Sequence, residues 1–209
     1  MIDTTAKNPQ KKTFLIMKVA AGLLIFTMLA LFIGHKHYAA KPSLSGKNLA
    51  LGPESLRPAL PKFNLTLENQ MTVSISNYKA RVLHLVFWAE WCAPCTTELP
   101  FLESVAKSYS ENEYKVILIN LDTTSDALAR AKKMQQNLSP SLEAVYQNTD
   151  ELKSLFNIGV LPYHYLIDDQ RRIASAFYSG LEGQEESFKE VLAQLIYQNS
   201  PNSPDPSPY

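Results

Sequence analysis

Two cysteines, Cys92 and Cys95, are the residues whose type and spacing point most directly to chemistry. They are separated by Ala93 and Pro94, follow a run of apolar residues and precede a segment with helical periodicity. A cysteine at the N-terminal end of a helix lies near unpaired backbone N–H groups, which stabilise its thiolate and lower its pKa below about 8.5. The spacing therefore predicts a reversible disulfide, with Cys92 as the attacking thiolate and Cys95 as the thiol that resolves the mixed disulfide.

The same pair is compatible with two other interpretations. Half of a zinc site would need further ligands such as His84 and His164 or two carboxylates, but the sequence has no second C-x-x-C and no H-x-x-H. A purely structural disulfide is also conceivable, although closing so short a loop restrains the unfolded chain very little. A buried, inert pair would not account for the flanking Trp91 and Pro94, so we expect redox chemistry and no metal site.

The segments that must position the cysteines alternate between strand and helix. Strands are predicted at 63–67, 71–75, 82–88, 116–121, 163–168 and 172–178, and helices after Cys92, after 123, at 151–157 and at 185–198. The first two strands alternate polar and apolar residues, whereas 82–88 and 116–121 are nearly continuous apolar runs, typical of strands buried on both faces. We expect an α/β domain at 61–199 with a mixed β-sheet, helices on both faces and an N-terminal β-hairpin.

The N-terminal part of the chain has a different composition. Residues 14–34 are almost entirely apolar, and a helix of about 20 residues spans about 30 Å, the thickness of the hydrocarbon core of a bilayer. A cleaved signal peptide is one alternative, but the small-residue cleavage pattern fails near Ala39 and Ala40. A buried core helix is another, and a helix apolar on all sides is unusual in so small a domain.

We therefore expect an uncleaved transmembrane signal anchor at 14–34, inserted in the lipid bilayer. It would follow a short cytoplasmic tail at 1–13 and place the domain on the periplasmic or extracellular side of the cytoplasmic membrane. Residues 35–60 and 200–209 are rich in proline and polar residues, which predicts an extended linker and a disordered tail. The 20 Lys and Arg balance the 20 Asp and Glu, so no overall positive charge favours nucleic acid, and we expect none as a partner.

The residues around the cysteines, FWAEWCAPCTTELP, resemble the active site of the thioredoxin family. The pattern W-C-x-x-C-x-x-E-x-P is similar to that of the membrane-anchored thioredoxin-like oxidoreductases of the TlpA/ResA type, and the similarity extends over about 61–198, including VILINLD and FNIGVLPYHYLID. The resemblance implies a thioredoxin fold and a thiol–disulfide oxidoreductase that reduces exported proteins, for example in cytochrome c maturation. It also implies protein disulfide or dithiol substrates, a membrane electron donor of the thiol-transfer type and no dissociable cofactor.

The resemblance also implies roles for residues near the cysteines. Pro162 stands where the family has a cis-proline, and the loop would offer the backbone of Leu161 to an extended substrate; without the resemblance a trans bond would be expected. Glu98 matches an acidic residue that exchanges protons with Cys95 or adjusts the thiol pKa values. Without the resemblance it would be a solvated glutamate in the first helical turn. Trp91, Pro94 and Pro162 are expected at a shallow apolar contact surface.

The sequence departs from the family pattern at two places. Val86 stands where cytosolic thioredoxins have a buried aspartate, which favours Glu98 for any transfer of protons. Tyr163-His164-Tyr165 replaces small hydroxyl residues after Pro162 and leaves the substrate open. We expect His84 and His164 to be packed or hydrogen-bonded strand residues rather than ligands or bases. Three other functions stay open: an oxidase or isomerase of exported proteins, a non-catalytic binding or metal-delivery module of the same fold, and a cytoplasmic thioredoxin.

Overall fold

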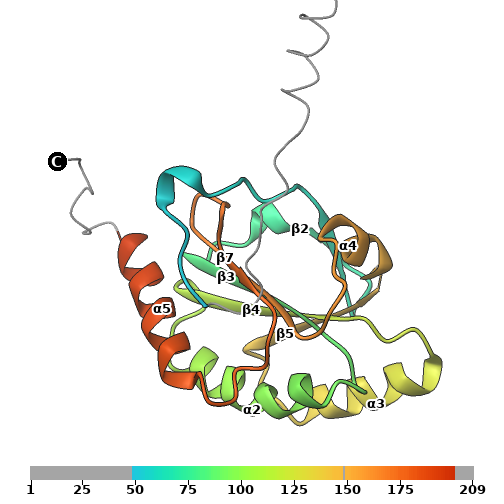
Figure 1. Cartoon of the computed structure of the whole chain (residues 1–209). Helices are drawn as coiled ribbons and strands as arrows, with labels where there is room; N and C mark the ends of the chain where they lie inside the picture. Colours follow the sequence, from blue (N-terminus) through green and yellow to red (C-terminus); the bar gives the residue numbers. More distant parts are fainter. Residues whose placement is uncertain (1–48, 148, 201–209) are drawn as a thin grey trace, which may run out of the picture. The chain divides into compact units, whose positions relative to one another are not determined.

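The computed structural model describes residues 49–147 and 149–200 of the 209-residue chain (Figure 1). The strands are β1 (Asn64–Leu67), β2 (Thr72–Ser74), β3 (Val82–Trp88), β4 (Tyr114–Asn120), β5 (Leu142–Gln147), β6 (Tyr163–Ile167) and β7 (Ile173–Phe177). The helices are α2 (Ala93–Lys107), α3 (Ser125–Gln136), α4 (Thr149–Leu155) and α5 (Glu185–Gln198), with short 3-10 turns at Glu54–Leu56 and Ile75–Asn77.

The seven strands form one mixed sheet in the order β2-β1-β5-β4-β3-β6-β7. The strand β3 lies near the middle, parallel to β4 and antiparallel to β6, and β4 is parallel to β5. Every residue of β3 is buried. Because β3 has a neighbour on each side and covering side chains on each face, its nearly continuous apolar sequence is what this position requires.

The sheet separates two hydrophobic clusters. Val82, Val86 and Trp88 of β3 pack with α2, α3 and α5, whereas the alternate residues Leu83 and Phe87 pack with α4 and with residues between β1 and β3. Figure 1 shows α2, α3 and α5 on one face of the sheet and α4 on the other. The expected mixed sheet with helices on both faces is thereby confirmed.

The strand β5 was not expected from the sequence. It lies between β1 and β4, antiparallel to the first and parallel to the second. Leu142 and Tyr146 face the cluster that contains α2, and Val145 faces the opposite cluster. Because both faces of β5 are covered, its sequence lacks the polar–apolar alternation that would have marked it as a strand.

Residues 49–60 are bound to the domain, in contrast to the extended linker that was expected over 35–60. The backbone N–H of Gly52 donates to the carbonyl of Ala174 at 2.8 Å, and that of Leu60 donates to the carbonyl of Arg171 at 2.8 Å. The guanidinium of Arg57 is buried and lies 3.3 Å from the carboxylate of Asp168. The folded part of the chain therefore begins before residue 61, because these hydrogen bonds extend the edge of the sheet beyond β7.

Several predicted segments lie outside the described residues. These are the tail at 1–13, the signal anchor at 14–34, the linker at 35–48 and the C-terminal tail from 201 onward. Within residues 49–147 and 149–200, no helix is both long enough and apolar enough to span a bilayer.

Candidate active site

The two cysteines form a disulfide at the N-terminal end of α2. Cys92 is the N-cap residue of this helix and Cys95 lies in its first turn, with 5.2 Å between their Cα atoms. Cys92 is 6% exposed and Cys95 is fully buried. Cys92 is therefore the more accessible of the two cysteines, which is compatible with the predicted role of attacking thiolate.

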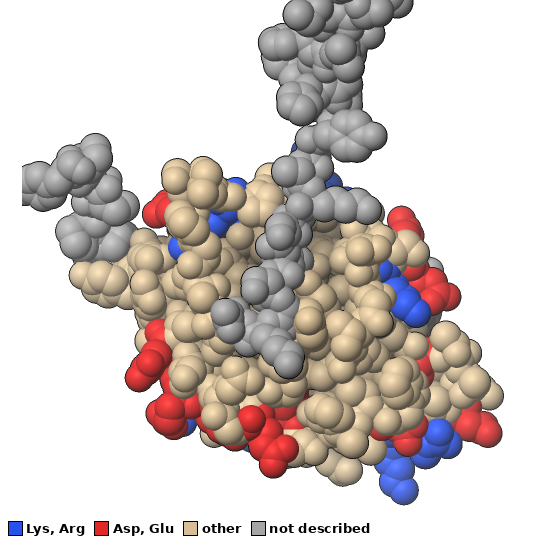
Figure 2. All heavy atoms as spheres, in the orientation of Figure 1, with Lys and Arg blue, Asp and Glu red and all other residues tan. Residues whose placement is uncertain are grey.

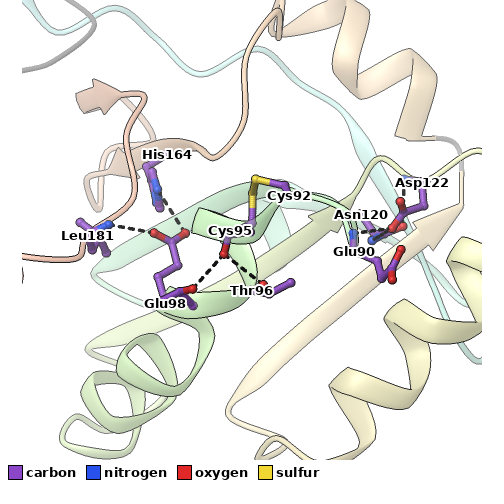
Figure 3. Close-up of a disulfide and its surroundings, with 11 residues drawn as sticks. Glu90, Cys92, Cys95, Thr96, Glu98, Asn120, Asp122, His164 and Leu181 are labelled. Carbon is purple, nitrogen blue, oxygen red and sulfur yellow. Dashed lines mark hydrogen bonds and ion pairs between the residues drawn. A yellow bond between two sulfur atoms is a disulfide. The ribbon is translucent and has the colours of Figure 1, made fainter.

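The loop that precedes Cys92 is held by the ends of two neighbouring strands. The backbone N–H of Glu90 donates to Oδ2 of Asp122 at 2.8 Å, and the side-chain amide of Asn120 donates to the same oxygen at 2.8 Å (Figure 3). The backbone N–H of Cys92 donates to the carbonyl of Ala89 at 3.1 Å. Asn120 and Asp122 were not singled out from the sequence, although they directly follow the apolar run of β4.

Apolar side chains lie at the surface near the disulfide. Trp91 is 69% exposed and Pro94 is exposed as well. The Leu161–Pro162 peptide bond is cis, and Leu161 packs against the cluster that contains both cysteines. Pro162 itself is buried, in contrast to the exposed apolar surface to which it was expected to belong. In the same loop the side chain of Val160 is 44% exposed.

Glu98 is a buried carboxyl group one helical turn after Cys95. It is 3% exposed, and its Oε2 accepts a hydrogen bond of 3.1 Å from the backbone N–H of Leu181 (Figure 3). Its Oε1 lies 3.4 Å from Nε2 of His164. Burial raises the pKa of Glu98 to about 8, against the smaller opposing effect of the Leu181 N–H. The alternative of a solvated glutamate is therefore wrong, and this carboxyl group can exchange a proton near neutral pH.

Two histidines connect Glu98 to the interior of the sheet. Nδ1 of His164 lies 3.1 Å from Nε2 of His84, and Nδ1 of His84 lies 2.6 Å from the hydroxyl of Tyr114. Burial lowers the pKa of both histidines, that of His164 to about 3, so both rings are neutral. The prediction that His84 and His164 are hydrogen-bonded strand residues is confirmed, but the sequence did not show that His164 lies next to Glu98.

The pairing of β3 with β6 explains this arrangement. Val86 lies opposite His164 in the register of the two strands, and His84 lies opposite Leu166. His84 and Val86 point to the face of the sheet that α2 covers, because they alternate with Leu85. Val86 is apolar. The polar side chains on this face of the sheet come instead from His164 of β6 and from His84, two residues earlier in β3.

The described residues contain no group of three or more His, Cys, Asp or Glu side chains that could hold a metal ion. Glu98 also lines a small cavity of about 50 Å³, together with Phe101, Leu181 and the acidic residues Glu182 and Glu185.

Comparison with known proteins places this geometry among thiol–disulfide exchange proteins. Residues 57–190 match the AhpC/TSA family. The chain is 22% identical to the thiol-disulfide oxidoreductase ResA of Geobacillus kaustophilus over 159 residues, which cover 76% of this chain and 84% of that protein. It is 23% identical to the ResA of Bacillus cereus over 195 residues, which cover 93% of this chain and 99% of that protein.

Solved structures show the same thioredoxin-like fold. The thioredoxin domain of a thiol-disulfide oxidoreductase from Bacteroides vulgatus is similar with a TM-score of 0.54 and 17% identity, over 71% of this chain and 99% of that one. The exposed lipoprotein thioredoxin Etrx1 from Streptococcus pneumoniae is similar with a TM-score of 0.53 and 22% identity, over 65% of this chain and all of that one. At these identities the similarity shows the fold, and the chemistry must be argued from the site.

Proposed function

We propose that this chain, which belongs to the AhpC/TSA family, is a membrane-tethered reductase of exported proteins. It is a thiol–disulfide oxidoreductase, with a disulfide at the N-terminal end of a helix in a thioredoxin-like fold. The observation that carries the proposal is the Cys92–Cys95 disulfide, with Cys92 6% exposed and Cys95 fully buried one helical turn before the buried residue Glu98. Such a pair can alternate between a dithiol and a disulfide within one helical turn.

The reaction begins with both cysteines reduced. The thiolate of Cys92, stabilised by the N-terminal end of α2, attacks one sulfur of a partner's disulfide. A bond forms between Cys92 and that sulfur, the partner's own S–S bond breaks, and its second sulfur leaves as a thiolate that takes up a proton from water.

The second step releases the partner. The carboxylate of Glu98 accepts the proton of the Cys95 thiol, and the resulting thiolate attacks Sγ of Cys92. The Cys92–Cys95 disulfide forms, and the bond to the partner breaks. The partner's sulfur leaves as a thiolate and receives a proton from the Glu98 carboxyl group. The partner has gained two electrons and two protons, one from water and one that began on Cys95. This chain has lost two electrons and the proton of Cys95, so a dithiol donor must reduce it again.

The surface around the disulfide suits a protein substrate. Trp91 and Val160 are large, exposed apolar side chains on two different loops, and Pro94 lies between the cysteines. We infer that these side chains contact the substrate together, since a contiguous exposed apolar patch commonly marks an interaction site. We assign the backbone of Leu161, before the cis bond, to the contact with an extended substrate segment.

The proposed location and electron donor are supported by the sequence. An apolar segment at 14–34 is long enough for a signal anchor, and a domain held outside the cytoplasmic membrane lacks direct access to cytosolic reductants. A membrane protein of the thiol-transfer type would therefore supply the electrons. Substrates of the cytochrome c maturation type and oxidised exported proteins in general both fit this scheme.

Trapping of the mixed disulfide tests the function directly. In a Cys95→Ser variant of the full-length chain the second step is blocked, so partner proteins should accumulate on Cys92 as complexes that separate on reduction. The complexes are detected on non-reducing gels after thiols are blocked in acid, and the partners are identified by mass spectrometry. The matched Cys92→Ser variant, which lacks the attacking thiolate, should trap none.

Two outcomes would contradict the proposal. Absence of mixed disulfides with Cys95→Ser would exclude thiol–disulfide exchange and favour a non-catalytic module. If thiol labelling in living cells showed the unmodified Cys92–Cys95 pair mainly oxidised, the chain would act as an oxidase rather than a reductase.

A further inference from the structure

We propose that Gly180 is a positioning residue for Glu98, because a glycine at this place lets the loop between β7 and α5 lie against Pro94. In this position the loop keeps the backbone N–H of Leu181 on the carboxyl group of Glu98, at 3.1 Å from its Oε2. The proposal rests on the proton-accepting role of Glu98 in the proposed function. Figure 3 shows the N–H of Leu181 and the carboxyl group facing each other beside the redox helix.

The loop is also bound on its other side. The backbone of Ser179 is hydrogen-bonded to the ring of His164 on β6. The side-chain amide of Gln184, the N-cap residue of α5, donates to the hydroxyl of Ser179 at 3.3 Å and to the carbonyl of Gly180 at 3.2 Å. The side chain of Leu181 is buried in the cluster that contains both cysteines. The loop is therefore held in one place, and its distance from α2 decides whether its N–H group reaches the carboxyl group.

A side chain at residue 180 would meet Pro94. A Cβ atom at Gly180 would lie 3.2 Å from Cβ of Pro94, 3.7 Å from its carbonyl oxygen and 3.8 Å from its Cα. Two carbon atoms in contact prefer about 3.5–4.0 Å, so the first of these distances is too short. The backbone of Gly180 is not in the left-handed conformation, which among the described glycines is found at Gly183. The contact with Pro94, and not the backbone conformation, is therefore what favours glycine here.

Pro94 has little freedom to move away from an added side chain. It lies in the first turn of α2, its ring fixes its own φ, and the disulfide between Cys92 and Cys95 closes across it. We therefore expect a methyl group added at Gly180 to push the loop away from α2. This shift would lengthen the hydrogen bond that the loop donates to Glu98, and such bonds weaken steeply when they are stretched or misaligned.

Leu181 supplies the hydrogen bond that favours the carboxylate of Glu98. Among the described residues no other donor reaches its oxygens, since Oε1 has no partner even though Nε2 of His164 lies 3.4 Å away. The ring of His164 is neutral, because burial lowers its pKa to about 3. The hydroxyl of Tyr114 on β4 stays protonated, because burial raises its pKa. Neither group provides a positive charge that would stabilise the carboxylate.

Burial and acidic neighbours act in the opposite direction. Burial raises the pKa of Glu98 to about 8, against the effect of the Leu181 N–H. Glu182 and Glu185 line the same cavity as Glu98, and Figure 2 shows acidic side chains gathered around the N-terminal end of α5. Nearby groups of like charge also disfavour ionisation. Loss of the Leu181 N–H would therefore raise the pKa of Glu98 further and leave less carboxylate at neutral pH for the second step of the reaction.

The pKa of Glu98 in the oxidised, full-length chain tests the proposal. It is measured by ¹³C NMR of the chain in detergent micelles, with the glutamate side-chain carboxyl carbons labelled and Glu98→Gln used to assign the signal. We expect Gly180→Ala to raise this pKa by about one unit, the usual effect of one hydrogen bond to a charged group. An unchanged or lowered pKa in this variant would overturn the proposal.

The matched control is Gly159→Ala. It adds the same methyl group at an exposed position where no atom of the described residues lies within 4 Å of the added carbon. The pKa of Glu98 should be the same in this variant as in the unmodified chain. A rise equal to that in Gly180→Ala would show that the contact with Pro94 is not the cause.

A second substitution separates the contact from a general loss of stability. Pro94→Gly removes the Cβ atom that the added methyl group meets, and the remaining distances of 3.7 and 3.8 Å are ordinary contacts. The double variant Gly180→Ala, Pro94→Gly should therefore have the same Glu98 pKa as Pro94→Gly alone, and a higher value would contradict the proposal. If Gly180→Ala alone does not fold, the double variant should fold, and its failure to do so would also overturn the proposal.

The release of a partner should change in the same sense. We expect the pH at which a peptide leaves its mixed disulfide with Cys92 at half the maximal rate to rise by about one pH unit in Gly180→Ala, which is about tenfold in rate below that pH. Well above the new midpoint the rate should equal that of the unmodified chain. Stopped-flow measurements over a range of pH test this, and an equal loss of rate at every pH would contradict a role through Glu98.

Failure of this proposal and failure of the proposed function are distinguishable. The pKa of Glu98 is measured in the oxidised chain without a partner, whereas trapping with Cys95→Ser requires one. If Cys95→Ser traps partners and Gly180→Ala leaves the pKa of Glu98 unchanged, the role of Gly180 is wrong and the exchange function stands. If no partner is trapped, the function is wrong, whatever the pKa is.

Discussion

Glu98 carries a carboxyl group that the fold keeps away from water, one helical turn after Cys95. Its folded-state pKa of about 8 lies above the ordinary value of 4.5. Between these two values the folded chain retains a proton that the unfolded chain has lost. The folded state therefore binds more protons than the unfolded state, and the contribution of Glu98 to stability falls as the pH rises through this range.

Replacement of Glu98 with Gln should remove this pH dependence. Relative to the Glu98→Gln variant, the free energy of unfolding of the unmodified chain should fall by up to about 1.4 kcal/mol for each pH unit between pH 5 and 8. Urea unfolding of the oxidised protein at several pH values measures the difference. The buried histidines destabilise both proteins equally in acid, since their lowered pKa values are common to the two. Parallel stability curves for the two proteins would show that Glu98 is not perturbed by burial.

The sequence predicted the residues that lie within the C-x-x-C motif or match a known pattern, and not those that are brought in by strand pairing. Cys92, Cys95 and Glu98 share one helix, so their spacing along the chain already places them together. His164 reaches Glu98 only through the pairing of β6 with β3. Histidine in an apolar strand is compatible with many partners, and its partner depends on a register that the sequence alone does not determine.

At the scale of elements, residues 49–60 act as an additional edge of the domain. Arg57 is the main contact: its guanidinium binds Asp168 at 3.3 Å, the carbonyl of Gly52 at 3.1 Å and the side chain of Gln198 at 2.9 Å. The segment was predicted as part of a linker because it is rich in proline and has no periodicity. These properties do not exclude an ordered segment held by backbone hydrogen bonds to its neighbours.

Loss of the Arg57 side chain should destabilise the domain. Arg57→Ala leaves the buried carboxylate of Asp168 with Arg172 as its remaining ion-pair partner, and we expect a loss of about 3 kcal/mol in the free energy of unfolding. Lys62→Ala, at an exposed position in the same part of the chain, should change it by less than about 0.5 kcal/mol. Chemical unfolding of both variants tests this, and similar values for the two would mean that residues 49–60 contribute little.

At the scale of the whole molecule, the proposed location is tested by cell fractionation. The full-length chain should remain in the membrane pellet after washing with high salt and alkaline carbonate, because a transmembrane anchor is not released by conditions that remove peripheral proteins. A version without residues 14–34 should appear in the soluble fraction and retain disulfide exchange. Full-length chain in the soluble fraction would instead support a cytoplasmic thioredoxin.

The hydrogen bond between Arg57 and Gln198 brings the two ends of the described chain close together, since one residue precedes β1 and the other ends α5. A short glycine-rich connection between these ends should therefore allow circular permutation, with new termini opened in the exposed turn at Asn69. In such a permuted protein α2 would have a different place in the order of the chain, while its contacts within the fold would stay the same.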